Sequence, residues 1–203
     1  MPFKKLHPDI QEKLVDLEIE TPTPLQSKSI PVIKSGANVY CIGPKGSGKT
    51  TTLILTTLHK LKCKSVGQQP RAIVIVEDKQ RALDLHDAFI SHLKYSAMRV
   101  YASYEQLHID VQKSEIFMGV DILISTPKAL NKLFLANSLS TSEIKIVSID
   151  DAEFLYQQSA YAALLSAEQF IKKSQFVVYA EEITPKIKRF ESFFMEYSKK
   201  VSV

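Results

Sequence analysis

Short apolar runs alternate with longer amphipathic stretches along the chain. The apolar runs are rich in isoleucine and valine and lie between polar or turn-forming residues, a pattern that is typical of buried strands. Predicted strands cover 38–42, 72–76, 98–102, 121–124, 144–149 and 176–180. The intervening stretches have helical periodicity, and predicted helices cover 9–17, 25–34, 50–63, 79–94, 104–118, 128–136, 152–172 and 185–197. Residues 196–203 indicate a helix end and leave room for a last strand.

Apolar strands that are separated by helices predict an α/β fold. We expect a mostly parallel central sheet flanked by helices on both faces. Ligands of such sheets bind beyond the carboxyl ends of the strands. The chain has 203 residues, of which 45% are hydrophobic and 24% charged, and this composition is typical of one soluble domain. We therefore expect residues 1–203 to form a single domain.

Charge and targeting signals narrow the class of protein only slightly. The formal net charge of +4 and a pI of about 8.9 permit a nucleic-acid partner without requiring one. No segment resembles a signal peptide or is apolar enough to cross a membrane, so we expect a cytoplasmic protein without a membrane partner. The two cysteines, Cys41 and Cys63, show no metal-ligand spacing, and the histidines are scattered.

Residues 43–50 read Gly-Pro-Lys-Gly-Ser-Gly-Lys-Thr and match the phosphate-binding pattern G-x-x-x-x-G-K-[ST]. The segment follows the predicted strand at 38–42 and leads into the predicted helix at 50–63, which is the context that this pattern requires. A glycine turn that matches by chance is the alternative, and the flanking elements argue against it. The motif therefore predicts a nucleoside triphosphate with Mg²⁺ as the ligand.

The chemistry of a triphosphate explains the residue types in this loop. Glycine has no Cβ, so the backbone can curl and bring its N–H groups against the phosphate oxygens. The helix N-terminus adds its positive dipole to the same anion. Lys49 is expected to reach the β- and γ-phosphates, and the Thr50 hydroxyl to ligate Mg²⁺. The predicted nucleotide contacts in the loop are Gly43, Lys45, Gly46, Ser47, Gly48, Lys49, Thr50 and Thr51.

A second acidic segment follows a later predicted strand. The apolar run at 146–149 leads into Asp150-Asp151-Ala152-Glu153. A phosphate-loop enzyme needs a carboxylate near Mg²⁺ and a group that orients the attacking water. An acidic helix start is the alternative, because carboxylates favour a helix N-terminus.

The order of these motifs resembles the N-terminal RecA-like domain of a DEAD-box RNA helicase, with Asp-Asp-Ala-Glu in place of Asp-Glu-Ala-Asp. Residues 19–26 resemble the Q motif, inside a Q-motif region at 1–35, and Ser125-Thr126-Pro127-Lys128 resembles Thr-Pro-Gly-Arg. The resemblance covers essentially the whole chain. It implies ATP with Mg²⁺ as cofactors and single-stranded RNA as a partner. A second RecA-like domain, in cis or in trans, is the other implied partner.

The resemblance also assigns roles to individual residues. It places Gln26 on the adenine edge, where an amide can both donate and accept. Asp150 matches the family's aspartate that positions Mg²⁺, and Asp151 stands where the family has its catalytic glutamate. Asp150, Asp151 and Lys49 are the predicted catalytic residues. The side chains expected on the RNA backbone are Lys79, Arg81, Thr126 and Lys128.

Several motifs depart from the family pattern. The segment Glu77-Asp78-Lys79-Gln80-Arg81-Ala82 stands where the family has Pro-Thr-Arg-Glu-Leu-Ala, and Ala102-Ser103 stands where it has paired glycines. The Ser-Ala-Thr motif reads Ala180-Glu181-Glu182, and Ile19 replaces an aromatic residue before the Q-motif prolines. Because Glu77 and Asp78 add negative charge, an ordinary solvated loop is the alternative for Lys79 and Arg81. We expect weak, salt-sensitive binding of single-stranded RNA.

These departures predict ATP binding with little or no hydrolysis or unwinding by this chain alone. Asp151 is one methylene shorter than glutamate, which sets its carboxylate back by roughly 1.5 Å, and a shift of about 1 Å can cost on the order of a hundredfold in rate. The arginine fingers of this family come from the absent second domain and are worth about 10³–10⁵ in rate. Glu181 and Glu182 either approach the acidic segment or point into solvent.

Three functional interpretations follow from the residues. The chain is one half of a helicase that meets its second domain in cis or in trans, or it is a degenerate adaptor that binds a protein or RNA under nucleotide control. The missing Ser-Ala-Thr motif favours the adaptor. A phosphate-loop motor of another class is the third interpretation, and the Q-motif resemblance argues against it.

Overall fold

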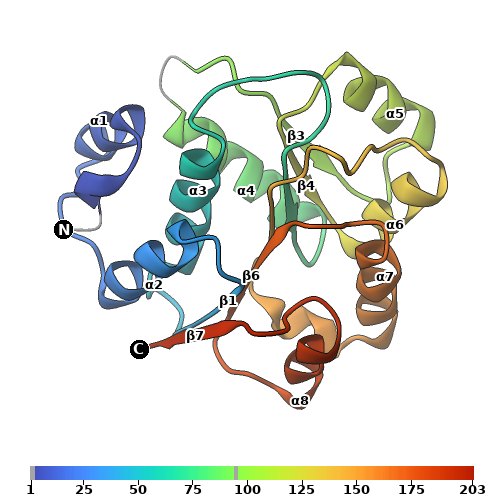
Figure 1. Ribbon diagram of the computed structural model, residues 1–203. Helices are drawn as coiled ribbons and strands as arrows, with labels where there is room; N and C mark the ends of the chain where they lie inside the picture. Colours follow the sequence, from blue (N-terminus) through green and yellow to red (C-terminus); the bar gives the residue numbers. More distant parts are fainter. Residues whose placement is uncertain (1–2, 94–95) are drawn as a thin grey trace.

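Parallel strands form the central sheet of the computed structural model, which describes residues 3–93 and 96–203 (Figure 1). The strand order is β3-β4-β2-β5-β6-β1-β7, and each hydrogen-bonded pair of neighbours is parallel. The predicted α/β fold is therefore confirmed. The strands are β1 (Val39–Ile42), β2 (Ala72–Ile75), β3 (Val100–Ser103), β4 (Ile122–Ser125), β5 (Ile146–Ile149), β6 (Gln175–Ala180) and β7 (Lys199–Ser202).

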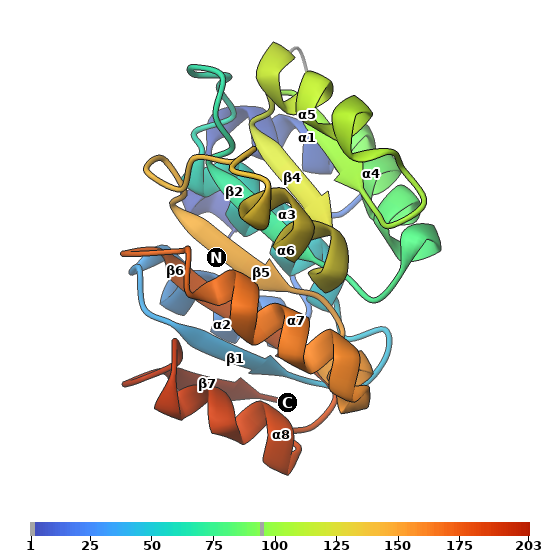
Figure 2. The same ribbon diagram turned by 90° about the vertical axis from the view of Figure 1, so that its right-hand side faces the viewer.

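Helices cover both faces of this sheet (Figure 2). Side chains alternate along each strand, so that Val39 and Cys41 of β1 join one core while Tyr40 and Ile42 join the other. The first core is closed by α1 (Pro8–Asp16), α2 (Pro24–Lys34), α3 (Lys49–Lys60) and α4 (Lys79–His92). The second is closed by α5 (Ile109–Met118), α6 (Pro127–Leu135), α7 (Gln158–Glu168) and α8 (Pro185–Lys188). Short 3₁₀ helices lie at η1 (Phe3–Lys5), η2 (Ala152–Tyr156) and η3 (Arg189–Ser192).

Several predicted helices are shorter or divided in the structure. The stretch 152–172 forms η2 and α7, because the backbone of Gln157 is extended between them. The stretch 104–118 becomes helical only at Ile109, since a turn precedes it in which the Leu107 amide donates to the Tyr104 carbonyl.

The remaining differences lie at element ends. The predicted helix 185–197 is α8 followed by η3, and β7 confirms a last strand in the sheet. The predicted helix 79–94 ends at His92, and its final position lies outside the described residues.

Candidate nucleotide-binding site

Four loops meet at the carboxyl edge of the sheet, because β2, β5, β6 and β1 are consecutive neighbours and run in the same direction. The phosphate loop follows β1, the acidic segment follows β5, and helix α4 begins shortly after β2. The segment at 181–182 follows β6 between them. Motifs that are far apart in the sequence are thereby brought to one site.

The phosphate loop has the backbone that the sequence predicts. Gly46 and Gly48 have φ values of 79° and 90°, a region that L-residues with side chains rarely adopt. No side chain caps the start of α3, which leaves the first N–H groups of this helix free to bind an anion. The loop encloses a cavity of about 350 Å³, lined by Lys45, Gly46, Gly48, Lys49, Thr50, Thr51 and Asp151.

Lys49 is buried along the loop rather than extended into solvent. Its side chain is only 5% exposed, and Nζ donates to the carbonyls of Gly43 at 2.8 Å and Pro44 at 3.2 Å. Nζ also lies 3.7 Å from Oδ1 of Asp151. The ammonium is thus held at the cavity wall between backbone carbonyls and a carboxylate, where a phosphate oxygen can replace either partner.

Gln26 belongs to a capping box that fastens helix α2 to the phosphate loop. Its side-chain Oε1 accepts from the backbone N–H of Thr23 at 2.9 Å, and the Thr23 Oγ1 accepts from the backbone N–H of Gln26 at 3.2 Å. The Thr23 hydroxyl donates onward to the Ser47 carbonyl at 2.7 Å. Gln26 is only 3% exposed, so its side-chain amide cannot reach an adenine edge in this arrangement. Recognition of adenine by Gln26 requires this side chain to leave the capping box.

The two aspartates after β5 differ in their surroundings. Asp150 is buried, and its Oδ1 has no hydrogen-bond partner among the described residues. Burial raises the pKa of the Asp150 carboxyl, and the nearby charge of Arg81 opposes that effect. Asp151 is half-exposed and reaches into the phosphate cavity.

Arg81 lies in this site, apart from the other side chains that the sequence assigned to RNA. Its Nη2 donates to Oδ2 of Asp150 at 2.5 Å and to Oγ1 of Thr50 at 2.9 Å. Its Nε donates to the same Asp150 oxygen at 2.9 Å. Sequence reasoning missed this position; the available signal was an arginine where the resembled segment has leucine.

Two of the other three predicted RNA contacts, Lys79 and Thr126, lie near the segment that follows β3. The ammonium of Lys79 sits 5.2 Å from the centre of the Tyr104 ring. Thr126 is buried, and its hydroxyl donates to Oε2 of Glu105 at 2.9 Å. Lys128 is exposed on the first turn of α6. The structure therefore gathers Lys79 and Thr126 beside 104–105, with a carboxylate on the threonine hydroxyl.

The segment that replaces Ser-Ala-Thr is held through its backbone. Oε1 of Glu153 accepts from the amides of Glu181 and Glu182, while both of those side chains are exposed. The glutamate carboxylates are therefore not directed at Asp150. Glu153 connects the acidic segment to 181–182 without any hydroxyl side chain.

The oxygens of this site are of the type that suits a hard cation such as Mg²⁺, but the Arg81 guanidinium already lies among them. Such ions prefer carboxylate, hydroxyl and water oxygens. Thr50 Oγ1 and Asp150 supply these groups beside the phosphate cavity, and the unpartnered Oδ1 of Asp150 is a buried acceptor aimed at no protein donor. Arg81 already donates to both residues.

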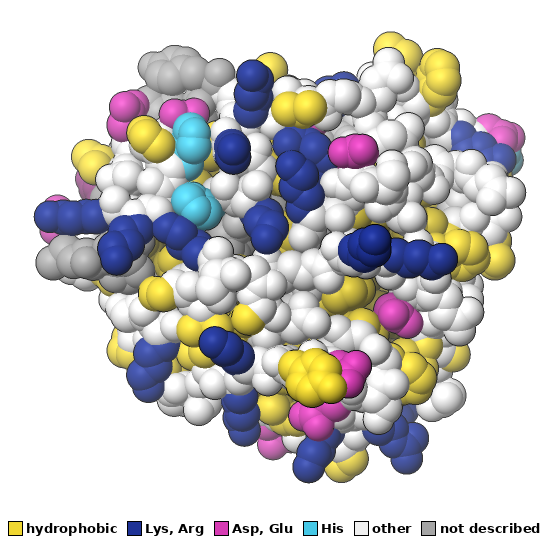
Figure 3. Space-filling view, viewed as in Figure 1, with side chains coloured by type: hydrophobic (Ala, Val, Ile, Leu, Met, Phe, Trp, Pro, Cys, Tyr) yellow, Lys and Arg dark blue, Asp and Glu magenta, His cyan; other side chains and the backbone are white. Residues whose placement is uncertain are grey.

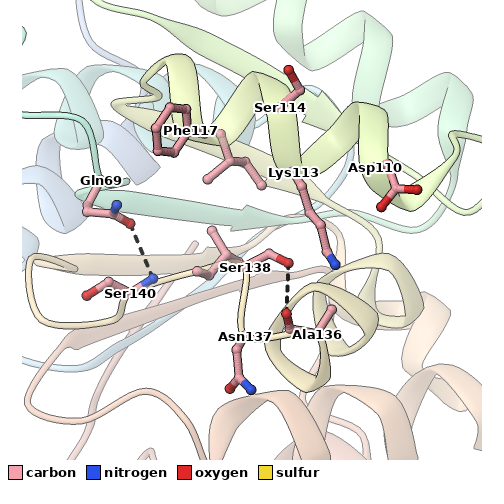
Figure 4. A pocket seen from close by; sticks show the side chains of 11 residues that line it. Gln69, Asp110, Lys113, Ser114, Phe117, Ala136, Asn137, Ser138 and Ser140 are labelled. Atoms are coloured by element: carbon pink, nitrogen blue, oxygen red, sulfur yellow. Dashed lines mark hydrogen bonds between the residues drawn. The ribbon is translucent and has the colours of Figure 1, made fainter.

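A larger cavity lies away from this chemistry. It has about 760 Å³ and opens between α5 and the loop after α6 (Figure 4). Gln69, Phe117 and Ser140 are among its lining residues, and the Ser140 amide donates to Oε1 of Gln69 at 3.2 Å. These residues precede β2, β4 and β5, so the cavity lies at the amino edge of the sheet, opposite the phosphate loop.

Side chains far apart in sequence also form a possible metal-ligand group near helix α1. The ligand atoms of His7, Asp9 and Cys63 all lie within 4.8 Å of one another. Sequence spacing did not reveal this group, because Cys63 comes more than fifty residues after His7. Burial, with a smaller contribution from Asp9, raises the pKa of the Cys63 thiol to about 12.

A parallel sheet with a phosphate loop after β1 and a buried aspartate after β5 defines a P-loop nucleotide-binding domain. Residues 23–180 match the family model of the DEAD/DEAH box helicases. The chain belongs to the DEAD/DEAH box helicase family. None of the helices that the structure describes is long and apolar enough to cross a membrane.

Known proteins agree with this assignment. The chain is 27% identical over 156 residues to the ATP-dependent RNA helicase RhlB of Shewanella oneidensis, covering 74% of this chain and 36% of that protein. A DEAD box protein from the hyperthermophile Methanococcus jannaschii has a similar structure, with a TM-score of 0.89, 16% identity, and coverage of 98% of this chain and 54% of that chain. A hypothetical ATP-dependent RNA helicase from Sulfolobus tokodaii gives a TM-score of 0.84 at 18% identity, covering 96% of this chain and 56% of that one. The chain thus spans about a third of the curated relative and about half of each solved chain.

Proposed function

We propose that this chain binds ATP through the phosphate loop and hydrolyses it slowly, or not at all, without a second RecA-like domain. The observation that carries this proposal is the phosphate cavity itself, with left-handed glycines, an uncapped start of α3 and the buried ammonium of Lys49. These features serve no purpose in folding alone, since an uncapped helix start and a buried ammonium both cost stability.

Thermal unfolding with and without ATP tests the binding proposal. A ligand that binds only the folded chain stabilises it by about 2.7 kcal/mol at a hundredfold excess over Kd. We expect ATP to raise the Tm of the wild-type chain and not that of Lys49→Ala. Lys132→Ala is the control, because Lys132 is an exposed residue of α6 on the other face of the sheet. An equal rise for wild type and Lys49→Ala would contradict binding at this loop.

The proposal of slow hydrolysis rests on Asp151 and on the expectation that the arginine fingers of this family come from a second RecA-like domain outside these 203 residues. We expect a steady turnover below about 0.1 s⁻¹ for the isolated chain. Adding single-stranded RNA and the C-terminal RecA-like domain of a relative in trans should raise the rate if the chain is half of a helicase. Turnover above this limit by the chain alone would refute the proposal.

The proposed RNA contacts are Lys79, Thr126 and Lys128, which lie at the starts of α4 and α6, the helices that follow β2 and β4 at the carboxyl edge of the sheet. Their ammonium and hydroxyl groups suit phosphate oxygens, so binding should weaken steeply as salt rises. Fluorescence anisotropy with a labelled single strand measures this dependence. An absence of binding at low salt would remove RNA from the proposal.

An adaptor that binds a partner under nucleotide control is the second candidate function. The contact between Glu153 and the 181–182 amides favours it, because the acidic segment is tied to this loop by backbone groups while two exposed glutamates face outward. Failure of a second domain in trans to stimulate turnover, with ATP binding intact, would favour the adaptor over the helicase half.

A further inference from the structure

Arg81 reaches the nucleotide site because of where helix α4 starts. Asp78 caps this helix, and its Oδ1 accepts from the Arg81 amide at 2.9 Å, which fixes Arg81 in the first turn. β2 is the direct neighbour of β5, so the first turn of α4 stands beside the aspartates that follow β5. The side chain is one-third exposed and extends from α4 onto Asp150.

The guanidinium contacts the Thr50 hydroxyl, which would ligate Mg²⁺, and Oδ2 of Asp150, which lies beside the unpartnered Oδ1 of the same carboxylate. A single nitrogen, Nη2, donates to Asp150 Oδ2 at 2.5 Å and to Thr50 Oγ1 at 2.9 Å, and it lies 3.4 Å from Asp151 Oδ2. Mg²⁺ would need to lie about 2.0–2.1 Å from its oxygen ligands. A metal between these groups would therefore lie within a few ångströms of a permanent positive charge.

The charges of the site are balanced without a metal. Asp150 and Asp151 contribute two carboxylates, and Arg81 and Lys49 contribute two cations within 4 Å of them. Without Arg81, the two carboxylates would face the Lys49 ammonium and the exposed Lys45 of the cavity lining, and a triphosphate would meet less positive charge unless a metal supplied it.

We propose that Arg81 is the resident cation of this site and makes ATP binding largely independent of Mg²⁺. The guanidinium holds Asp150 and Thr50 in place, and Thr50 itself lines the phosphate cavity. For Mg²⁺ to take the same oxygens, Arg81 has to leave a buried carboxylate, and that exchange offsets the gain from metal binding. This inference rests on the proposed ATP binding.

The test compares the Kd for ATP in excess Mg²⁺ with the Kd in EDTA. We expect the two values to agree within about threefold for the wild-type chain. Arg81→Leu restores the residue of the resembled motif, and we expect it to bind ATP at least about tenfold more tightly with Mg²⁺ than with EDTA. Lys132→Leu, which removes one exposed positive charge from α6, should behave as the wild type.

Electron paramagnetic resonance of Mn²⁺ supplies a direct readout of the metal. We expect little Mn²⁺ immobilised in the wild-type complex with ATP and about one ion per chain in the Arg81→Leu complex. Arg81→Gln keeps an amide donor for Asp150 and should shift both readouts in the same direction if Arg81→Leu does not fold, as judged by circular dichroism.

The results distinguish the role of Arg81 from the proposed ATP binding. A wild-type chain that binds ATP tenfold more tightly with Mg²⁺, with the same ratio in both Arg81 variants, overturns the role of Arg81 and leaves ATP binding standing. No ATP binding by any of these proteins, with or without metal, overturns the proposed function and this inference with it.

Discussion

Asp121 holds a buried ionic network at the amino ends of β2, β3 and β4, and Asp121→Asn tests its contribution to stability. The side chain is fully buried. Oδ1 accepts from Arg71 at 2.9 Å, and Oδ2 accepts from Arg99 Nε at 3.0 Å and from Ser65 Oγ at 2.9 Å. Arg71 is itself only 4% exposed, so it has no access to water when its carboxylate is removed.

The lowered pKa of Asp121 indicates the order of magnitude of this contribution. Burial alone would raise the pKa, but hydrogen bonds from Arg99, Arg71 and Ser65 bring it from 3.8 down to about 2. That difference corresponds to about 2 kcal/mol of stability. Because the folded-state pKa is the lower one, this stability is present above about pH 4 and is lost as the pH falls toward 2. Because Arg71 then keeps only neutral acceptors, such as the Leu61 and Lys64 carbonyls, its buried charge loses its counter-charge, which brings the total for Asp121→Asn to about 3–5 kcal/mol.

Urea unfolding of both proteins between pH 7 and pH 2.5 measures the effect. We expect the difference in unfolding free energy to be largest at pH 7 and to shrink as the pH falls. Asp87→Asn is the matched control, because the Asp87 side chain is 85% exposed, and it should change stability little. A loss below about 1 kcal/mol at pH 7, or a difference that does not depend on pH, would refute this reasoning.

Three other predictions concern the site. Gly48→Ala places a Cβ 2.7 Å from Nε2 of Gln26 at a φ of 90°, whereas Gly36→Ala has a similar φ of 89° and no atom within 4 Å. We expect Gly36→Ala to lower the free energy of unfolding by about 1–2 kcal/mol through the backbone alone. Gly48→Ala should lower it further and should also weaken ATP binding. Equal losses of the two variants in urea unfolding would show that the capping box does not constrain the loop. Glu105→Gln removes the negative charge beside the Thr126 hydroxyl and keeps an acceptor for it, and we expect tighter RNA binding by anisotropy at low salt. Unchanged binding would mean that RNA phosphates do not come near Glu105. Asp151→Glu restores one methylene and should raise single-turnover hydrolysis about tenfold or more when a second domain and RNA are supplied; an unchanged rate would mean that side-chain length does not limit the reaction.

Local patterns predicted the sheet and the phosphate loop because both are encoded by adjacent residues. The run at 72–76 is apolar throughout, as expected of a strand covered on both faces. The glycines within 43–48 directly indicate a loop whose backbone curls around an anion. The division of 152–172 was missed, since it depends on the extended backbone of Gln157, and the stretch has no glycine or proline to signal a break.

Long-range placement could not be predicted in the same way. Arg81 was assigned to RNA because its sequence neighbours suggested a backbone contact, yet the strand order sets β2 beside β5 and brings the guanidinium onto Asp150. Strand order is not encoded in any local pattern. Gln26 was placed on adenine by resemblance, and only the structure shows that its oxygen is engaged by the Thr23 amide.

Isothermal titration calorimetry with ATP and then GTP tests the central claim most directly. The account predicts that the wild-type chain binds ATP, with heat that is lost in Lys49→Ala. If Gln26 leaves its capping box to contact adenine, ATP should bind more tightly than GTP. No heat with either nucleotide, or equal binding by wild type and Lys49→Ala, would contradict the claim that this phosphate loop is a working ATP site.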